Sequence, residues 1–205
     1  MVDIRDPLYG FISLSKEEKK LISTEPFQRL RRIRQLGTSF LIYPSAEHNR
    51  FAHSLGVMEV ATRIFDEIMK RDGNILRWSK EEIRRNRQLL RLAALLHDVG
   101  HAPFSHVSDD LFADTIGSHE EMSARLILDS ELTPIIANMG KEYGFSPQEV
   151  AGLITGKFKS KYTLLFQIFS SKIDADKMDY LLRDSHFAGV KYGNYDFHRV
   201  LQNIT

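Results

Sequence analysis

The sequence predicts an all-α fold: a bundle of helices in one domain, with at most one small β-hairpin. Three observations support this prediction. Helix-start patterns recur along the chain, two long segments carry apolar residues at helical spacing or all round, and strand-like segments are few and short. With 205 residues, 42% of them hydrophobic and 27% charged, the chain is long enough to bury a core without crosslinks.

Helix starts are marked at four places by a Ser that is followed three residues later by Glu. In this capping-box pattern, the Ser hydroxyl and the Glu carboxylate each bind a backbone N–H group that the first helical turn leaves unpaired. The four serines are Ser15, Ser79, Ser118 and Ser146. After the last of them, Pro147 stands at the first helical position, where its lack of an N–H group is tolerated.

Two segments in the middle of the sequence differ in how their apolar residues are spaced. From residue 57 onward, apolar residues recur with a period of about 3.6, at Val57, Val60, Ala61, Ile64, Phe65 and Ile68. This spacing predicts an amphipathic helix with one buried face. The segment LLRLAALLHDVGH (89–101) is apolar almost all round, which predicts a central, buried helix. Gly100 and Pro103 are expected to end it.

Strand signals are limited to two short apolar segments. The segment TSFLIYP (38–44) is the better candidate and GFISL (10–14) is the second, so the sequence is compatible with a small hairpin. The residues FHRVLQNIT (197–205) have a helical pattern, and nothing there marks a natural end. We therefore expect residues 1–205 to form a single domain that is the N-terminal part of a longer chain.

Composition and charge exclude several classes of protein. The chain has no Cys, which excludes disulfides, thiolate metal sites and a Cys nucleophile. Its 28 Lys and Arg against 27 Asp and Glu give a net charge of +1, which is not typical of a chain that binds nucleic acid along its whole length. No apolar run approaches the roughly 18 residues of a membrane span, and the charged first residues differ from a signal peptide. We therefore expect a cytoplasmic protein without a membrane partner.

A polar cluster interrupts the apolar segment near its C-terminal end. His97 and Asp98 directly follow apolar residues, and burying a carboxylate there costs several kcal/mol unless it has a partner. A metal ion would be such a partner, and a structural His–Asp hydrogen bond is the alternative. In a continuous helix His101 would lie one turn from His97, on the same face. His106 follows shortly after.

Further His and Asp residues stand in comparable contexts. His53 is at the start of the predicted amphipathic helix, and Asp174, Asp176 and Asp179 lie in KIDADKMDYLLRD (172–184). A mixed set of His and carboxylate ligands suits Mn, Fe, Zn, Co or Ni better than Mg or Ca, which prefer oxygen ligands alone. These residues therefore indicate a site for a divalent transition metal.

The order of these residues resembles the H…HD…D signature of the HD-domain metal-dependent phosphohydrolases. His53, the pair His97–Asp98 and Asp176 occupy the signature positions. Five longer blocks are similar to successive blocks of the deoxynucleoside triphosphate triphosphohydrolase branch: DPLYGFISL, PFQRLRRIRQLG, YPSAEHNRFAHSLGV, HDVGHAPFSH and IDADKMDYLLRD. The similarity extends from about residue 6 to about residue 196, and it implies an HD-domain helical bundle.

The resemblance implies which residues would bind a metal. The implied ligands are His53, His97, Asp98 and Asp176. Asp176 is preferred to Asp174 because it begins DKMDY, which matches the D-K-x-D-Y arrangement of the family. These ligands would hold one divalent transition metal, Mn, Fe, Zn, Co or Ni, and Mg could accompany the nucleotide.

The resemblance also implies roles around the substrate. The catalytic groups of the family fall at His119, Asp109, His101 and His106. The groups that contact the nucleotide fall at Arg50, Gln35, Leu36, Lys177, Tyr180 and Asp184. In this assignment His119 is oriented by Asp109, and Asp184 accepts a hydrogen bond from the sugar 3′-hydroxyl. Gln35 and Leu36 line the side of the sugar where a 2′-hydroxyl would clash.

The implied activity is hydrolysis of deoxynucleoside triphosphates at the α-phosphate, which releases deoxynucleoside and triphosphate. Another HD-type nucleotidase or phosphodiesterase is a close alternative, because it would share the metal residues. A nucleotide- or nucleic-acid-binding regulator that retains the metal site is a second alternative. The resemblance also implies a homo-oligomer. Members of this branch continue for roughly as much chain again, so we expect a partly open substrate pocket.

A regulatory nucleotide site near Gln28 and Arg31 is a further implication of the resemblance. Ser23 stands where the family has the acidic residue that reads guanine there. The surrounding basic run consists of Arg29, Arg31, Arg32 and Arg34. A solvated surface is the default interpretation of such a run, and a nucleic-acid role is non-specific. The histidines interpreted mainly as surface, capping or ordinary residues are His48, His186 and His198.

Overall fold

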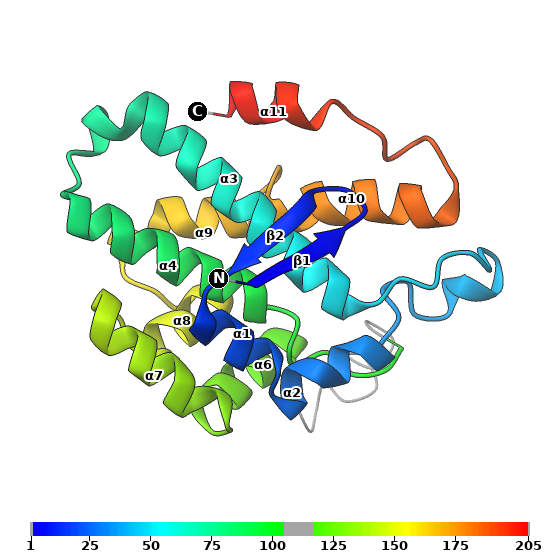
Figure 1. Ribbon diagram of the computed structural model, residues 1–205, viewed down its shortest axis with the longest axis horizontal. Coiled ribbons are helices and arrows are strands. Elements are labelled where there is room, and N and C mark those ends of the chain that lie inside the picture. Colours follow the sequence, from blue (N-terminus) through cyan, green and yellow to red (C-terminus); the bar gives the residue numbers. More distant parts are fainter. Residues whose placement is uncertain (1, 105–116, 205) are drawn as a thin grey trace.

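The computed structural model describes residues 2–104 and 117–204. Its helices form a bundle with a two-stranded antiparallel hairpin on one side (Figure 1). The predicted all-α fold with a small hairpin is therefore confirmed. The helices are α1 (Lys16–Ile22), α2 (Glu25–Gln28), α3 (Arg50–Leu76), α4 (Lys80–Leu96), α6 (His119–Leu128), α7 (Leu132–Tyr143), α8 (Pro147–Ile154), α9 (Thr163–Phe169), α10 (Ala175–Ala188) and α11 (Phe197–Asn203). The strands are β1 (Val2–Asp6) and β2 (Gly10–Leu14).

Capping side chains explain where several of these helices begin. Reciprocal capping boxes start α1 at Ser15, α4 at Ser79 and α8 at Ser146, as predicted. At the start of α6, the hydroxyl of Ser118 accepts a hydrogen bond from the N–H of Glu121. Each of these bonds pairs a backbone N–H group that the first helical turn would otherwise leave unsatisfied.

The two longest described helices, α3 and α4, lie side by side through the bundle (Figure 1). The buried face of α3 contains the apolar residues that the helical period predicted, Val57, Val60, Ala61, Ile64, Phe65 and Ile68. In α4 every residue from 88 to 96 is buried, which confirms the predicted central helix. Within the described ranges, no helix is both long enough and apolar enough to cross a membrane.

The chain leaves the helical path of α4 earlier than the sequence predicted. The helix ends at Leu96 and does not continue to residue 101. The N–H of Val99 donates to the carbonyl of Leu96, and the N–H of His101 donates to the carbonyl of Asp98. These bonds span three residues instead of four, so the chain turns more tightly here. The polar cluster is therefore carried by a turn at the end of a buried helix.

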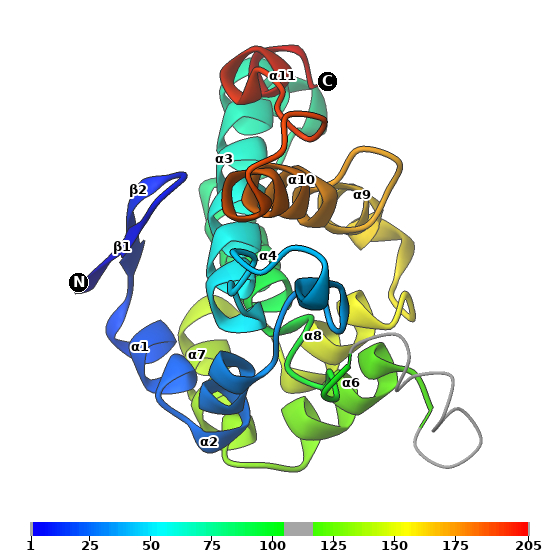
Figure 2. The same ribbon diagram turned by 90° about the vertical axis from the view of Figure 1, so that its right-hand side faces the viewer.

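The hairpin pairs β1 with β2 so that Asp6 lies opposite Gly10. Its β2 strand coincides with the second strand candidate of the sequence, which is thereby confirmed. Side chains alternate along this strand: Ile12 and Leu14 are buried in the core, whereas Phe11 is exposed. Figure 2 shows the hairpin on one side of α3, with α9 and α10 on the other.

The strand predicted at 38–44 is wrong. Residues Ser39–Leu41 form a short 3₁₀ helix, in which the N–H groups of Leu41 and Ile42 donate to carbonyls three residues earlier. The side chains of Leu41 and Ile42 are 74% and 78% exposed. An apolar composition favours a strand only where the side chains can be buried against neighbours, and here they are not.

Candidate active site

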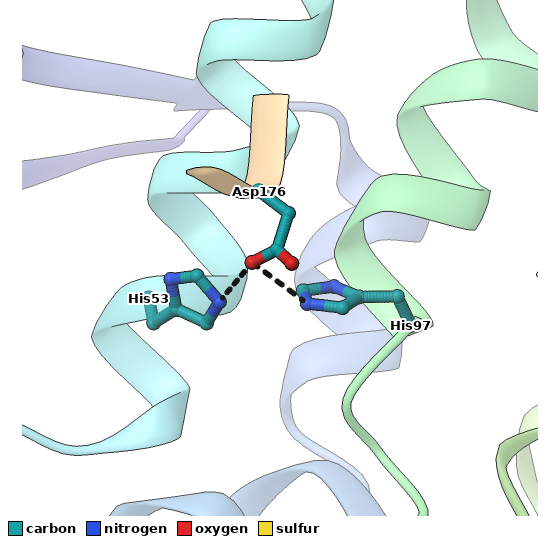
Figure 3. A group of neighbouring side chains, drawn as sticks. All are labelled: His53, His97 and Asp176. Carbon is teal, nitrogen blue, oxygen red and sulfur yellow. Dashed lines mark ion pairs between the residues drawn. The ribbon is translucent and has the colours of Figure 1, made fainter. Parts of the chain in front are cut away.

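Three separate segments bring two imidazoles and a carboxylate together (Figure 3). His53 lies in the first turn of α3, His97 caps the end of α4, and Asp176 lies in the first turn of α10. Oδ1 of Asp176 is 3.0 Å from Nε2 of His53 and 3.9 Å from Nε2 of His97. The three residues thus form a compact donor group although 123 positions, 53 to 176, separate the first from the last.

Hydrogen bonds on the far side of each ring determine which nitrogen faces Asp176. Nδ1 of His97 lies 2.8 Å from the carbonyl oxygen of Ala94, and Nδ1 of His53 lies 2.8 Å from Oδ2 of Asp179. A carbonyl and an ionised carboxylate can only accept, so each Nδ1 donates and each Nε2 of a neutral ring offers a lone pair. Nε2 of His97 is buried and has no hydrogen-bond partner among the described residues. Such an atom is suited to binding a metal ion.

Asp98 lies between these imidazoles and a third one. Its Oδ1 is 3.2 Å from Nε2 of His97 and 3.6 Å from Nε2 of His101, and its Oδ2 accepts from the guanidinium of Arg50. Burial would raise the pKa of Asp98, but His97 and Arg50 together lower it well below its usual value. Asp98 is therefore ionised at neutral pH, with its carboxylate directed at the candidate ligands.

The charges around His53 favour a cation at this position. Burial alone would lower the pKa of His53, but hydrogen bonds to Asp176 and Asp179 and their charges raise it to about 10. A metal cation in place of the proton would meet the same favourable charges. The ligand atoms of His53, His97 and Asp176 lie within 4.8 Å of one another, which is compatible with metal–ligand bonds of about 2.0–2.2 Å. The residues present therefore fit a divalent transition metal.

Asp174, the alternative ligand in the same segment, has a different role. It is the N-cap of α10, where its carboxylate accepts from the N–H groups of Ser171 and Lys177. Its Oδ2 is also 2.6 Å from Nζ of Lys177. These bonds satisfy Asp174 at the end of its own helix, whereas Asp176 contacts His53. Of the two aspartates, Asp176 is therefore the one that lies beside His53.

A second group of possible ligands adjoins the first. Ligand atoms of Asp98, His101 and His119 lie within 4.8 Å of one another, and the rings of His101 and His119 stack with centroids 3.9 Å apart. His119 is the first residue of α6. The hydroxyl of Ser123, one turn further along α6, donates to the carbonyl of His97 at 2.6 Å. This bond ties α6 to the end of α4 and holds His119 beside the site.

A cavity of about 300 Å³ connects these groups. The predicted site residues in its wall are Gln35, Leu36, Arg50, His97, Asp98, His101, His119, Asp176, Tyr180 and Asp184. His53 is buried, and neither His53 nor Lys177 is part of the wall. His106 and Asp109 lie outside the described residues. One concave site therefore joins the candidate metal ligands to most of the residues predicted to contact a nucleotide.

The HD domain family matches residues 50–184 of the chain. This range contains His53, His97, Asp98 and Asp176, the residues that the fold brings together. The chain belongs to the HD-domain phosphohydrolases. The residues of the HD signature therefore lie at or beside the cavity, and HD domains bind divalent metals.

Several relatives match the chain along nearly all of its length. The chain is 42% identical over 200 residues to the uncharacterized protein YwfO of Bacillus subtilis, covering 97% of this chain and 43% of that protein. It is 32% identical over 229 residues to human deoxynucleoside triphosphate triphosphohydrolase SAMHD1, covering 97% of this chain and 35% of SAMHD1. A crystal structure of a hypothetical protein from Aquifex aeolicus is 35% identical with a TM-score of 0.80, covering 98% of this chain and 50% of that one. The HD-domain chain thus spans half or less of the length of these relatives.

The structure adds site residues that the sequence interpretation did not assign. His48, interpreted mainly as a surface or capping residue, is buried, and its Nε2 lies 2.6 Å from Oδ1 of Asp184. Asp179 is fully buried between His53 and Arg183. The spacing of Asp179 and Arg183, four residues apart on a helix, is a sequence signal that could have identified that pair. No local pattern points to the contact of His48 with Asp184.

Gln28 and Arg31, the candidates for a regulatory nucleotide, lie in contact with one another. Nε of Arg31 donates to Oε1 of Gln28 at 2.8 Å, and the Arg31 guanidinium lies 3.5 Å from the ring centroid of Phe51. Arg34, from the same basic run, is paired with Glu47. Regulation by a nucleotide at this position stays a prediction.

Proposed function

We propose that this HD domain catalyses metal-dependent hydrolysis of deoxynucleoside triphosphates at the α-phosphate, with deoxynucleoside and triphosphate as products. The observation that carries the proposal is the cavity whose wall contains candidate metal ligands, the cationic Arg50, and the polar residues Gln35, Tyr180 and Asp184. These groups suit the parts of a nucleotide: cationic groups suit its phosphates, and polar groups suit its sugar. The similarity to SAMHD1, which is named a deoxynucleoside triphosphate triphosphohydrolase, supports this substrate class.

The metal would be held by His53, His97, Asp98 and Asp176. Mn, Fe, Zn, Co and Ni are the candidates for this mixed donor set, and Mg would accompany the nucleotide. A divalent ion held there supplies Lewis-acid polarisation of a phosphoryl oxygen and activates water at neutral pH. The protein contributes two imidazoles whose Nδ1 atoms are already bound to oxygen acceptors, so that both Nε2 atoms would be available to the ion.

Proton donation to the leaving group is assigned to His119. Water attacks the α-phosphorus, the bond from phosphorus to the 5′-oxygen breaks, and this oxygen needs a proton to leave as an alcohol. An imidazole with a pKa near neutrality is suited to that step. His119 lies in the cavity wall with its ring stacked on His101, and Asp109 is proposed to orient it. His101 and His106 are assigned to the phosphate side.

Arg50 and Lys177 are proposed to bind the triphosphate. Arg50 is largely buried, is hydrogen-bonded to Asp98 and lines the cavity. Its charge would therefore lie beside a phosphate bound next to the metal. Nζ of Lys177 is bound to Asp174 and to the carbonyl of Ser171, but its side chain is 41% exposed, and we propose that it exchanges these partners for a bound phosphate chain. Guanidinium and ammonium groups neutralise charge that spreads over phosphoryl oxygens in the transition state.

The sugar is assigned to Gln35, Leu36, Tyr180 and Asp184, which lie in the cavity wall. Asp184 would accept a hydrogen bond from the 3′-hydroxyl. Burial and the charge of Asp176 raise the pKa of Tyr180, so its phenol keeps its proton and can donate to a substrate. A pocket closed around C2′ rejects an added hydroxyl by about 10²-fold, whereas an unmet hydrogen bond to Asp184 costs more.

The test is a substrate panel with the purified protein. The panel contains the four deoxynucleoside triphosphates, the matching ribonucleotides and deoxynucleoside monophosphates, each with Mn²⁺ or Mg²⁺. We expect a higher kcat/KM for each deoxynucleotide than for its ribonucleotide, and no turnover of monophosphates. Equal kcat/KM for a deoxynucleotide and its ribonucleotide would favour a general nucleotidase or phosphodiesterase. Metal binding without turnover of any nucleotide would favour a non-catalytic regulator.

The proposal includes a homo-oligomer, a cytoplasmic location and a regulatory nucleotide near Gln28 and Arg31. These parts rest on the resemblance to the triphosphohydrolase branch. Light scattering with and without added nucleotide tests the homo-oligomer and the regulatory nucleotide. A mass that increases with nucleotide in the unmodified protein, but not in Arg31→Ala, would support a regulatory site. A mass unaffected by nucleotide in both proteins would contradict it.

A further inference from the structure

A buried series of hydrogen-bonded charges connects His53 to the N-terminal hairpin. Oδ2 of Asp179 is 2.8 Å from Nδ1 of His53. Both oxygens of Asp179 accept from Arg183, each at 2.8 Å. Nη1 of Arg183 donates to Oδ2 of Asp6 at 2.9 Å. Asp179 and Arg183 are each 0% exposed, so water cannot replace any of these bonds.

Asp6 anchors the far end of this series. Its Oδ2 accepts from Arg183, and its Oδ1 accepts from the N–H groups of Leu8 and Tyr9, at 2.8 and 3.1 Å. These residues form the turn between β1 and β2. The orientation of Arg183, and through it that of Asp179, is therefore fixed by the hairpin as well as by α10.

Gly56 allows this arrangement to lie directly against α3. A Cβ atom at Gly56 would lie 1.9 Å from Oδ1 of Asp179 and 2.3 Å from Nη2 of Arg183. Because both side chains are fully buried and bonded at each end, they have no space into which to move. Gly73, on the same helix, differs in this respect: a Cβ atom there would meet nothing within 4 Å. The two glycines provide a matched pair for experiment.

We propose that Asp179, held in place by Arg183, is a positioning residue that presents Nε2 of His53 to the metal. The inference rests on the metal centre of the proposed function and is independent of the substrate. A carboxylate bound to Nδ1 sets the tautomer and the rotation of the imidazole and strengthens Nε2 as a donor. The two hydrogen bonds from Arg183 keep the plane of the Asp179 carboxylate fixed, so the ring of His53 is aligned before any metal binds.

A purely structural role for the same network makes a different prediction. If Asp179 and Arg183 only held α10 against α3, their substitution would lower the unfolding temperature. The affinity of the remaining folded protein for a metal would not change. Metal affinity measured on folded protein therefore separates a positioning role from a packing role.

The experiment uses Co²⁺ alone, without nucleotide, because its visible absorption reports ligand geometry. Affinity is measured by competition with a chelator, and circular dichroism checks folding. Asp179→Asn and Gly56→Ala should each weaken Co²⁺ binding by about 10–100-fold and alter the visible spectrum. Arg183→Lys should weaken it in the same direction, because an ammonium cannot bind both oxygens of Asp179 in the same plane. Gly73→Ala should leave affinity and spectrum unchanged, and so should Ile136→Ala, which removes core contacts of α7.

The outcomes distinguish the possible errors. Folded Asp179→Asn and Gly56→Ala proteins with the unmodified affinity and spectrum would overturn the positioning role. If Asp179→Asn does not fold, Gly56→Ala decides the matter by itself. An equal loss of affinity in Ile136→Ala would show that general destabilisation is the cause, which also overturns the inference. An unmodified protein that binds no Co²⁺ would overturn the metal centre itself.

Discussion

Nε2 of His48 lies 2.6 Å from Oδ1 of Asp184, although 136 positions separate the two residues in the sequence. The ring of His48 is also stacked on Phe187, with centroids 4.9 Å apart, and its side chain is fully buried. Asp184 is partly exposed and forms part of the cavity wall. His48 therefore fixes one oxygen of Asp184 and leaves the other side of the carboxylate available at the proposed sugar end.

Replacement of His48 should alter how the sugar is recognised. In His48→Ala the carboxylate of Asp184 loses a buried partner and becomes free to rotate, so we expect KM for a deoxynucleotide to rise about tenfold, the scale of one lost hydrogen bond to a charged group. The difference in KM between 3′-hydroxyl and 3′-deoxy substrates should become smaller, and metal content should not change. The control is His186→Ala, which replaces an exposed histidine on α10, the helix that also carries Asp184. An equal rise in KM for 3′-hydroxyl and 3′-deoxy substrates would contradict this role of His48.

The two aspartates at the start of α10 should respond differently to substitution. Asp176→Ala removes a carboxylate that contacts His53, and we expect metal content to fall from about one ion per chain to nearly none. Asp174→Ala removes the N-cap of α10 and should lower the free energy of unfolding by about 1 kcal/mol while metal content is retained. Elemental analysis and denaturant unfolding measure the two effects. A full metal load in Asp176→Ala would exclude Asp176 as a ligand.

His119 should be separable from the metal ligands. His119→Ala should retain its metal and lose about 10²–10⁴-fold in kcat, the usual contribution of a general acid. Single-turnover kinetics and elemental analysis on the same sample check both statements. His198→Ala, outside the cavity wall, should behave like the unmodified protein. Loss of metal in His119→Ala would instead make His119 a ligand, together with its neighbours Asp98 and His101.

The ion pair of Glu18 and Arg91 should make stability depend on pH. Burial would raise the pKa of Glu18, but hydrogen bonds and charge from Arg91 lower it below its usual 4.5. The folded state therefore binds a proton less readily than the unfolded state. The resulting stability is fully present above about pH 4.5 and is lost as the pH falls through the lower pKa of the folded state.

Urea unfolding at several pH values tests this dependence. Glu18→Gln should lower the free energy of unfolding by about 3 kcal/mol at pH 7, because it leaves Arg91 buried without a counter-charge. The variant should also lose less stability than the unmodified protein on acidification below pH 4.5. Glu17→Gln, on the more exposed side of α1, is the control. Parallel pH profiles for Glu18→Gln and the unmodified protein would contradict the assignment.

Local interactions account for most of what the sequence could predict about the fold. The starts of α1, α4 and α8 were predictable because each capping box is complete within four residues. The end of α4 at Leu96 was not predictable, because apolar residues continue past it into the turn that contains His97 and Asp98. The strand assigned to 38–44 was wrong because apolar composition does not reveal whether side chains such as Leu41 are buried.

The candidate site shows the same division between local and long-range information. The signature of His53, His97, Asp98 and Asp176 could be identified because their order resembles that of the HD-domain family, and the fold brings these residues together. The contacts that hold them could not be predicted, since they join distant segments. Arg183 binds Asp6 across 177 positions, and no periodic pattern in either segment specifies the other.

The identity of the phosphorus-containing product tests the central claim most directly. The unmodified protein is incubated with a deoxynucleoside triphosphate and Mn²⁺, and the reaction is followed by ³¹P nuclear magnetic resonance. Hydrolysis at the α-phosphate predicts inorganic triphosphate as the product from the earliest time points, together with an equal amount of deoxynucleoside. Release of pyrophosphate with a deoxynucleoside monophosphate, or of orthophosphate with a diphosphate, would contradict the proposed reaction.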